Sequence, residues 1–316
     1  METIYLDSET CFVEKTCATI GFFDGVHRGH LALLEQLKGL ARHRGQVSTV
    51  ITFERHPRQV VSTDWQPLLL TTLEEKCQLI AQAGIDLLVV LRFDARMAAL
   101  SARAFMDVVL KRQLCVLTLL TGYDNRFGHD RVECFDDYVT YGRELGIDVR
   151  LGQVLNIGDG AVSSSRVRRL LNSGDVRGAA DCLGRRYVLS GAVVHGEQIG
   201  RQMGFPTANM AVADNQKLVP TDGVYAVGVS IAEESGAPQV QPRTELRGVM
   251  NIGTRPTFNG QQRTLEVHLL DFSGDLYGKR LTVSFIERLR AELHFESPEE
   301  LRRQMMADAE QARRCR

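Results

Sequence analysis

The sequence predicts two domains of different class: an α/β domain over residues 1–183, and a small antiparallel β-barrel with a closing helix over residues 184–316. The chain has 316 residues, which is long for a single hydrophobic core. In the first half, short apolar runs alternate with helical patterns, which indicates a mostly parallel sheet covered by helices on both faces. Near Gly184 the pattern changes to closely spaced strands and turns, which is typical of a barrel or a sandwich.

The strands expected in the first half are short, rich in β-branched residues, and bounded by glycine or polar residues. They are Cys17–Gly21, Val47–Phe53, Leu87–Leu91, Val116–Thr121 and Val149–Leu155. Amphipathic segments with helical spacing lie between them at His30–Arg44, Thr72–Ala83, Ser101–Leu114 and Asp136–Leu145. Thr72 and Glu75 form a capping box that predicts where the second of these helices begins.

The second half contains five strand-like runs and little helical periodicity until its end. The runs are Tyr187–His195, Val224–Ile231, Leu246–Asn251, Leu265–Leu270 and Leu281–Leu289. The segment Ala232–Arg243 is polar and rich in Gly, Pro and Gln, which predicts a mobile loop. A final helix is expected from Ser297, because Pro298 suits the first helical position and Glu300 completes a capping box.

The bulk composition argues against several classes of protein. A net charge of −1 gives no reason to expect nucleic acid or an anionic membrane as a partner. The seven cysteines are scattered without metal-ligand spacing, so we expect free thiols in a reducing compartment. The sequence shows neither a secretory signal nor an apolar run that could span a bilayer. We therefore expect a cytoplasmic protein that acts on small molecules, and its oligomeric state is left open.

The densest chemical signal is the string IGFFDGVHRGH at residues 20–30. A buried strand ends at Gly21, a turn uses Asp24 and Gly25, and a helix then begins. Together these form an anion-binding site, because the backbone N–H groups and the dipole at a helix N-terminus favour negative charge. We expect Gly21, Phe22, Asp24 and Gly25 to bind the nucleotide at this turn.

His27 and His30 lie three residues apart, so both can face one side of the first helical turn. Two imidazoles beside a helix N-terminus can contact triphosphate oxygens and stabilise the charge that develops on a departing pyrophosphate. The alternative is a pair of surface histidines with structural hydrogen bonds, or a weak metal site. Their position after a strand and a glycine turn favours the catalytic interpretation.

The HxGH motif of these histidines is similar to that of the nucleotidyltransferase superfamily. The longer string GFFDGVHRGH resembles the bifunctional riboflavin kinase/FAD synthetase family of prokaryotes, and further motifs follow in the family's order along nearly the whole chain. The resemblance implies an N-terminal nucleotidyltransferase domain that adenylylates FMN to FAD and releases pyrophosphate. It also implies a C-terminal domain that phosphorylates riboflavin to FMN. Both reactions would use ATP with Mg²⁺.

Two loops of the first half also resemble this family, and each follows a predicted strand, where ligands of open α/β sheets bind. The string TFERHP has Arg55 where the family commonly has proline, and its His56 by itself is more often structural than functional. In the string GYDNRFG, the resemblance implies that Asn125 and Arg126 contact the substrate phosphate. A polar turn would favour the same residue types.

The string VSSSRVR at residues 162–168 is the second strong signal. Serine hydroxyls and backbone N–H groups at a helix start can cradle phosphate, and an arginine adds a bidentate charged contact. The string resembles the family's ISSTRIR motif, which implies that Ser163 binds the nucleotide and that Ser164 and Arg166 act in catalysis. The alternative is an ordinary serine N-cap with solvated arginines.

In the second half, the string HGEQIGR could fold over phosphates through its backbone, although it matches neither GxGxxG nor the P-loop. The string GFPTAN at residues 204–209 is more specific, because it resembles the signature of riboflavin kinases. The resemblance implies that Thr207 and Asn209 hold Mg–ATP through neutral oxygens, which suit a hard cation. The other nucleotide-binding residues expected here are Gly196, Gly200, Arg201, Gly204 and Pro206.

Glu266 lies among strand residues, where an isolated glutamate ordinarily faces water. The family places its catalytic base in a matching strand. The resemblance therefore implies that Glu266 accepts the proton of the ribityl 5′-hydroxyl as this oxygen attacks the γ-phosphate of ATP. His268 shares the face of Glu266 by strand alternation, and we expect it to face solvent. Arg290 is expected to contact the flavin.

Three alternatives remain open on the sequence. The chain could retain only one of the two activities, because Arg55 departs from the family pattern. It could be another HxGH nucleotidyltransferase with a binding barrel, although near-neutral charge and few clustered aromatic residues disfavour an RNA module. It could also be a non-catalytic flavin-binding regulator, which the intact HxGH motif and the Glu266 candidate disfavour.

Overall fold

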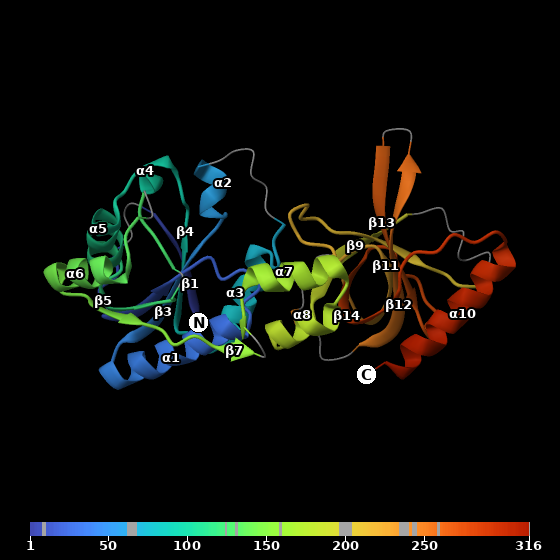
Figure 1. Ribbon diagram of the computed structural model, residues 1–316, viewed down its shortest axis with the longest axis horizontal. Helices are drawn as coiled ribbons and strands as arrows, with labels where there is room; N and C mark the ends of the chain where they lie inside the picture. The colour runs from blue at the N-terminus through green and yellow to red at the C-terminus, as the bar shows by residue number, and fades with distance from the viewer. Residues whose placement is uncertain are drawn as a thin grey trace. The chain divides into compact units, whose positions relative to one another are not determined.

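The structure is a computed structural model that describes residues 1–7, 11–61, 68–123, 125–129, 132–157, 160–195, 204–233, 240–241, 245–257 and 260–315. By its internal contacts the chain divides into two units, Met1–Val162 and Ser163–Arg316. The first is an α/β unit and the second contains a closed barrel (Figure 1). The two fold classes predicted from the sequence are confirmed. The domain boundary expected after residue 183 stays a prediction.

The first unit is built on a six-stranded parallel sheet with the order β1-β4-β3-β2-β5-β6. Its strands are β1 (Glu2–Leu6), β2 (Thr16–Ile20), β3 (Val47–Phe53), β4 (Leu87–Leu91), β5 (Val116–Thr121) and β6 (Asp148–Leu151). All five predicted strands are present. The additional strand β1 lies at the sheet edge and is mostly exposed, so it carries no apolar run that would reveal it.

The four predicted helical segments of this unit are present, one of them in altered form, and two short helices at Pro57–Val61 and Ala95–Ala98 were not predicted. The helices are α1 (Arg28–Arg44), α2 (Pro57–Val61), α3 (Leu73–Gln82), α4 (Ala95–Ala98), α5 (Ala102–Phe105), η1 (Met106–Gln113) and α6 (Phe135–Leu145). The capping box of Thr72 and Glu75 is confirmed at the start of α3. The single helix expected over residues 101–114 is instead a short α-helix that continues as the π-helix η1. A two-stranded hairpin, β7 (Asn156–Ile157) with β8 (Gly160–Ala161), precedes the second unit.

The strand order of the sheet reverses between β2 and β5. Parallel crossovers are right-handed, so α1 covers one face of the sheet while α5, η1 and α6 cover the other (Figure 1). Ligands of such sheets bind outside the carboxyl ends of the strands at this reversal. The turn after β2 and the loop after β5, both singled out by the sequence, therefore meet at the position where a ligand is expected.

The second unit is a six-stranded antiparallel barrel closed in the order β10-β13-β12-β11-β14-β9. Its strands are β9 (Val188–Val194), β10 (Ala208–Ala211), β11 (Gly223–Glu233), β12 (Leu246–Thr257), β13 (Gly260–Leu269) and β14 (Lys279–Arg290). Helices α7 (Ser164–Ser173) and α8 (Val176–Leu183) precede the barrel, and α10 (Pro298–Arg314) follows it. The sequence did not predict β10, which has four residues, or α8. Most of the predicted mobile loop lies outside the described residues.

Helix α10 begins as predicted, with Ser297 as its N-cap and Pro298 in its first turn. Its small buried residues, Ala309 and Ala312, pack against Leu270 and Ile286 of the barrel unit. A partly buried ion pair adds to this contact, because two nitrogens of Arg290 on β14 bond to the carboxylate of Asp308 at 2.8–3.1 Å.

We expect Asp308→Ala to destabilise the barrel unit by about 1–3 kcal/mol, because the substitution leaves the partly buried guanidinium of Arg290 without its counter-charge. Urea unfolding of the full chain measures this change. Replacing both partners, as in Arg290→Met with Asp308→Leu, should cost less than Asp308→Ala alone. A loss below about 1 kcal/mol for Asp308→Ala would show that the pair does not fix α10.

Candidate functional site

The turn after β2 is fixed by the buried carboxylate of Asp24. It accepts hydrogen bonds from Leu70 N at 3.0 Å, and from Thr71 N and Oγ1 at 3.1 and 3.2 Å. Gly25 N donates to the same threonine oxygen at 3.0 Å. These bonds hold a turn in which two non-glycine residues, Phe23 and Val26, have positive φ. Asp24 thus shapes the turn through its carboxylate, and its contact with a nucleotide stays a prediction.

His27 and His30 stack on each other at the first turn of α1, with ring centroids 3.6 Å apart. His27 is the N-cap, and its Nδ1 accepts a hydrogen bond from His30 N at 3.2 Å. Nδ1 is therefore the unprotonated nitrogen of the neutral ring, so Nε2 carries the proton. A Cβ at Gly29 would lie 3.1 Å from the His27 ring and from the Val162 carbonyl, so glycine favours this close approach.

A cavity of about 580 Å³ lies at the carboxyl ends of β2, β3 and β5. Aromatic rings form much of its wall, and Arg58, Arg126 and two histidines bring positive or titratable groups to it. Among its lining residues are Gly21, Phe22, Phe53, His56, Phe93, Phe105, Asn125, Arg126, Phe127 and His129. Four residues predicted from separate motifs, Gly21, Phe22, Asn125 and Arg126, therefore line one cavity. The cavity suits a flat aromatic ligand that carries negative charge.

Two residues of this cavity make contacts that the sequence did not predict. The amide of Asn125 donates to the carbonyl of Ile20, so this side chain joins the loop after β5 to the end of β2. His56, expected to be structural, lines the cavity and contacts the Phe22 ring edge-on at 4.6 Å. Its Nδ1 accepts from Arg58 N at 3.1 Å, which leaves Nε2 as the donor of the neutral ring.

Lys76 on α3 lies behind this cavity and was not singled out from the sequence. Its Nζ donates to the carbonyls of Phe22 at 3.2 Å and Phe53 at 3.0 Å, and it lies 4.3 Å from the centroid of the Phe22 ring. The residue is 3% exposed. Burial lowers the pKa of its ammonium from 10.5 to about 8, against an opposing effect of the Asp24 charge.

The serine motif forms the start of α7 in the second unit. Ser163 is the N-cap, and its side chain accepts from Arg166 N at 3.2 Å. The helix start expected from this motif is therefore confirmed. The phosphate-binding and catalytic roles of Ser163, Ser164 and Arg166 stay predictions.

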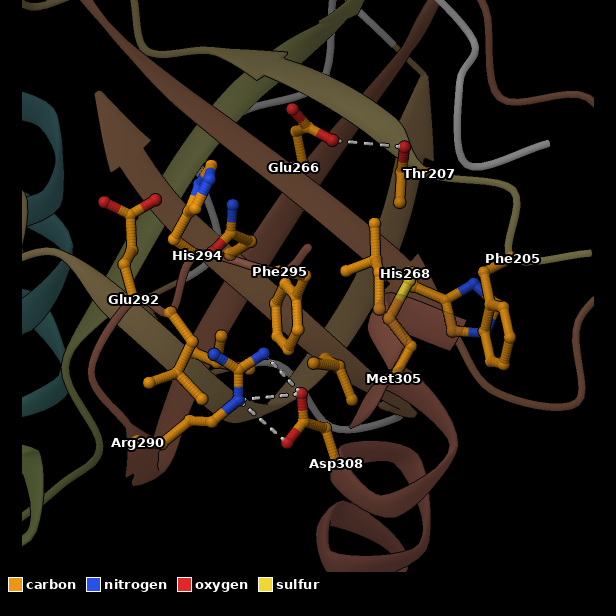
Figure 2. Close-up of a pocket in the computed structure, with 15 residues that line it drawn as sticks. Phe205, Thr207, Glu266, His268, Arg290, Glu292, His294, Phe295, Met305 and Asp308 are labelled. Carbon is orange, nitrogen blue, oxygen red and sulfur yellow. Dashed lines mark hydrogen bonds and ion pairs between the residues drawn. The ribbon is translucent and has the colours of Figure 1, made fainter. Parts of the chain in front are cut away.

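In the barrel unit, Glu266 lies on β13, which is paired with β10 on one side and β12 on the other. In these registers Glu266 is directly opposite Asn209 and Asn251. Thr207, at the entrance to β10, donates its hydroxyl to Glu266 Oε2 at 3.4 Å. Figure 2 shows the carboxylate of Glu266 and the Thr207 hydroxyl joined in this way at one end of the site.

Two cavities meet at Thr207, which lines both of them. The first has a volume of about 400 Å³ and the second about 720 Å³. The first joins the polar end at Glu266 to an apolar part formed by Phe205, Phe295, Met305 and other residues (Figure 2). The second contains Asn209 and the segment from Phe272 to Tyr277. Thr207 thus lies between a largely apolar cavity and a second cavity whose other lining residues are different.

The segment before Thr207 is held by His268. Its Nδ1 lies 2.8 Å from the carbonyl of Pro206, and because a carbonyl only accepts, Nδ1 carries the proton. The side chain is half-buried and lines the smaller cavity, and the expectation that it faces solvent stays a prediction. Gly204 has a φ of 83°, which favours glycine at the start of this segment. Gly196, Gly200 and Arg201 lie outside the described residues.

Arg290, expected to contact a flavin, lines the smaller cavity, but its guanidinium is bonded to Asp308 and lies 5.7 Å from the Phe295 ring centroid. A flavin could therefore contact only the flat face of the Arg290 guanidinium, because the charge of this group is already paired with Asp308. That contact stays a prediction, and the structure supports a role for Arg290 in supporting the cavity wall.

Two family models match the chain. Residues 10–166 match the model described as FAD synthetase, and residues 183–316 match the model described as riboflavin kinase. Within the described residues, every helix is too short or too polar to cross a lipid bilayer.

Known proteins match the chain over nearly its full length. A protein of Escherichia coli K12 named bifunctional riboflavin kinase/FMN adenylyltransferase is 41% identical, over 95% of this chain and 92% of the relative. A protein of the same name from Pseudomonas fluorescens is 41% identical over 94% of this chain and 91% of its own length. A crystal structure from Streptococcus pneumoniae, named a macrolide-efflux protein, has a TM-score of 0.88 at 28% identity and covers 99% of both chains.

The lowered pKa of Lys76 predicts a pH dependence of stability. Between pH 8 and pH 10.5 the unfolded chain binds a proton on Lys76 that the folded chain has released, so the free energy of unfolding rises with pH in this window. Relative to Lys76→Met, the unmodified chain should gain about 3 kcal/mol across the window. Urea unfolding of both proteins at several pH values measures this gain. A pH-independent difference between them would contradict the lowered pKa.

Proposed function

Because this chain belongs to the family of bifunctional riboflavin kinase/FMN adenylyltransferases, we propose that it carries out both reactions, each with ATP. The barrel unit phosphorylates riboflavin to FMN, and the site after β2 adenylylates FMN to FAD. The observation that carries the proposal is the contact of Thr207 with Glu266 where two cavities meet. This arrangement suits transfer of a group between two ligands that meet at Thr207, beside one carboxylate.

In the kinase reaction, the smaller cavity receives riboflavin. Its apolar part, with Phe205 and Phe295, packs against the tricyclic ring, and the ribityl chain extends towards Glu266. The 5′-hydroxyl oxygen attacks the γ-phosphorus of ATP, its proton passes to the Glu266 carboxylate, and ADP departs from the larger cavity. The hydrogen bond from Thr207 orients the carboxylate for this transfer.

Mg²⁺ fits the residues at this junction. Thr207 and Asn209 supply neutral oxygens beside Glu266, and such oxygens together with phosphates are the ligands that this hard cation prefers. The described part of the chain has no group of three or more His, Cys, Asp or Glu side chains arranged to hold a metal. The ion would therefore be bound jointly with the nucleotide, and when bound it would neutralise phosphate charge.

In the adenylyltransferase reaction, the cavity lined by Phe22 and Arg126 receives the flavin and phosphate of FMN. A phosphate oxygen of FMN attacks the α-phosphorus of ATP, and pyrophosphate leaves. The nucleophile is already ionised near neutral pH, so no general base is required and positioning carries the catalysis. His27 and His30, at the start of α1, stabilise the charge on the leaving group. Ser164 and Arg166 bind nucleotide phosphates in the same reaction.

Glu266→Gln should lower the rate of FMN formation by about a hundredfold or more, because the amide cannot accept the hydroxyl proton. FAD formation from supplied FMN should be unchanged in the same preparation. Chromatographic separation of the flavins measures both rates, and Glu296→Gln, at an exposed glutamate, is the matched control. Equal rates for the variant and the unmodified chain would rule out Glu266 as the base.

His30→Ala should reduce FAD formation by about a hundredfold while sparing riboflavin phosphorylation, since it removes one group that stabilises the departing pyrophosphate. His43→Ala, near the other end of the same helix, is the matched control. Loss of FMN formation in folded His30→Ala protein would show that the two reactions are wrongly assigned to the two units.

A further inference from the structure

We propose that Lys76 is a positioning residue for FMN: its ammonium holds the ends of two strands and the Phe22 ring that forms part of the flavin cavity. The proposal rests on the assignment of this cavity to FMN. No motif points to Lys76, and it acts through Phe22 rather than on the reacting atoms.

The first observation behind the proposal is that Lys76 bonds to two main-chain carbonyls. Phe53 ends β3, and Phe22 lies just beyond β2, so Nζ joins the carboxyl ends of two neighbouring strands. The Phe22 carbonyl also accepts from Thr52 Oγ1 at 3.2 Å. With both bonds in place, the backbone at Phe22 is fixed immediately before the turn that leads to His27.

The second observation is that the ammonium of Lys76 also contacts the Phe22 ring. The ammonium of Lys76 lies 4.3 Å from its centroid, and the imidazole of His56 contacts it edge-on at 4.6 Å. Both Phe22 and His56 line the cavity, whereas Lys76 does not. A change at Lys76 therefore reaches the ligand only by moving the ring or its backbone, and a cation near an aromatic ring is attracted to the ring electrons.

Ion pairing does not explain an ammonium at this position. Lys76 is 3% exposed, and among the described residues no carboxylate lies within ion-pair distance of its Nζ. The ionisable groups that act on it are Asp24, from the turn after β2, and Cys77 on its own helix. A methionine would fill similar space without the cost of burying a charge. A costly polar group is retained where it serves a site.

The test is the steady-state kinetics of FAD formation by the full chain carrying Lys76→Met, compared with Lys15→Met. Lys15 is exposed and lies before β2, at the opposite end of the strand from Phe22. We expect the KM for FMN to rise about tenfold in Lys76→Met, while the KM for ATP and kcat change less than about threefold. Riboflavin phosphorylation in the same sample should not change.

A pH profile separates positioning from a loss of structure. In the unmodified chain the KM for FMN should rise as the pH passes about 8, where Lys76 loses its charge, and in Lys76→Met it should stay level. A KM for FMN within twofold of the control, or an equal effect on both substrates, would overturn the proposal.

The cavity assignment can fail separately from the proposal for Lys76. If the unmodified chain forms no FAD from FMN, the function proposed for this unit fails. Equilibrium binding of FMN, monitored by quenching of flavin fluorescence, then tests the role of Lys76. Weaker binding in Lys76→Met supports positioning, and equal binding overturns it.

Discussion

The pairing of β13 with both β10 and β12 is the constraint on which the barrel site depends. Closure of the barrel places the short strand β10 beside β13, so Glu266 is flanked by Asn209 and Asn251 rather than left on a solvent-facing edge. The same closure brings the entrance of β10, with Thr207, against the carboxylate. Residues nearly sixty positions apart in the sequence thereby form one polar cluster. The apolar cavity beyond it, lined in part by Leu301 and Met305 of α10, is where we propose that the flavin ring binds.

In the first unit, distant residues are brought together by a different constraint, which is the reversal of strand order between β2 and β5. The reversal opens the sheet at its carboxyl edge, and the side chains that bridge it hold the turn in place. Asn125 joins the loop after β5 to the end of β2, Asp24 fixes the turn, and Lys76 ties β2 to β3. These three polar contacts thus hold the segment that carries His27 and His30. The turn therefore has little freedom to adapt, which suits the proposed reaction, because that reaction depends on positioning.

Sequence reasoning found the elements whose signals are local. Strands such as Leu87–Leu91 are uninterrupted apolar runs, while the capping box at Thr72 and the N-cap serine at Ser297 mark helix starts. It missed β10, because four residues after a proline are too few to show alternation, and it could not see the π-helical continuation of α5. It also missed Lys76, which looks like a polar residue of an amphipathic helix until the carbonyls of Phe22 and Phe53 are brought to it. The hydrogen bond of His268 was not predicted for the same reason, since its partner Pro206 is 62 residues away. Long-range partners of single polar residues leave no local pattern.

The most direct test of the central claim is a single incubation of the purified chain with riboflavin, Mg²⁺ and ATP labelled in either the γ- or the α-phosphate, with the flavins separated afterwards. Attack at two different phosphorus atoms predicts that γ-label enters both FMN and FAD, whereas α-label enters FAD alone. Absence of α-label from every flavin, in folded protein that still forms labelled FMN, would contradict the assignment of adenylyl transfer to the first unit. Absence of both labels would contradict the assignment of either reaction to this chain.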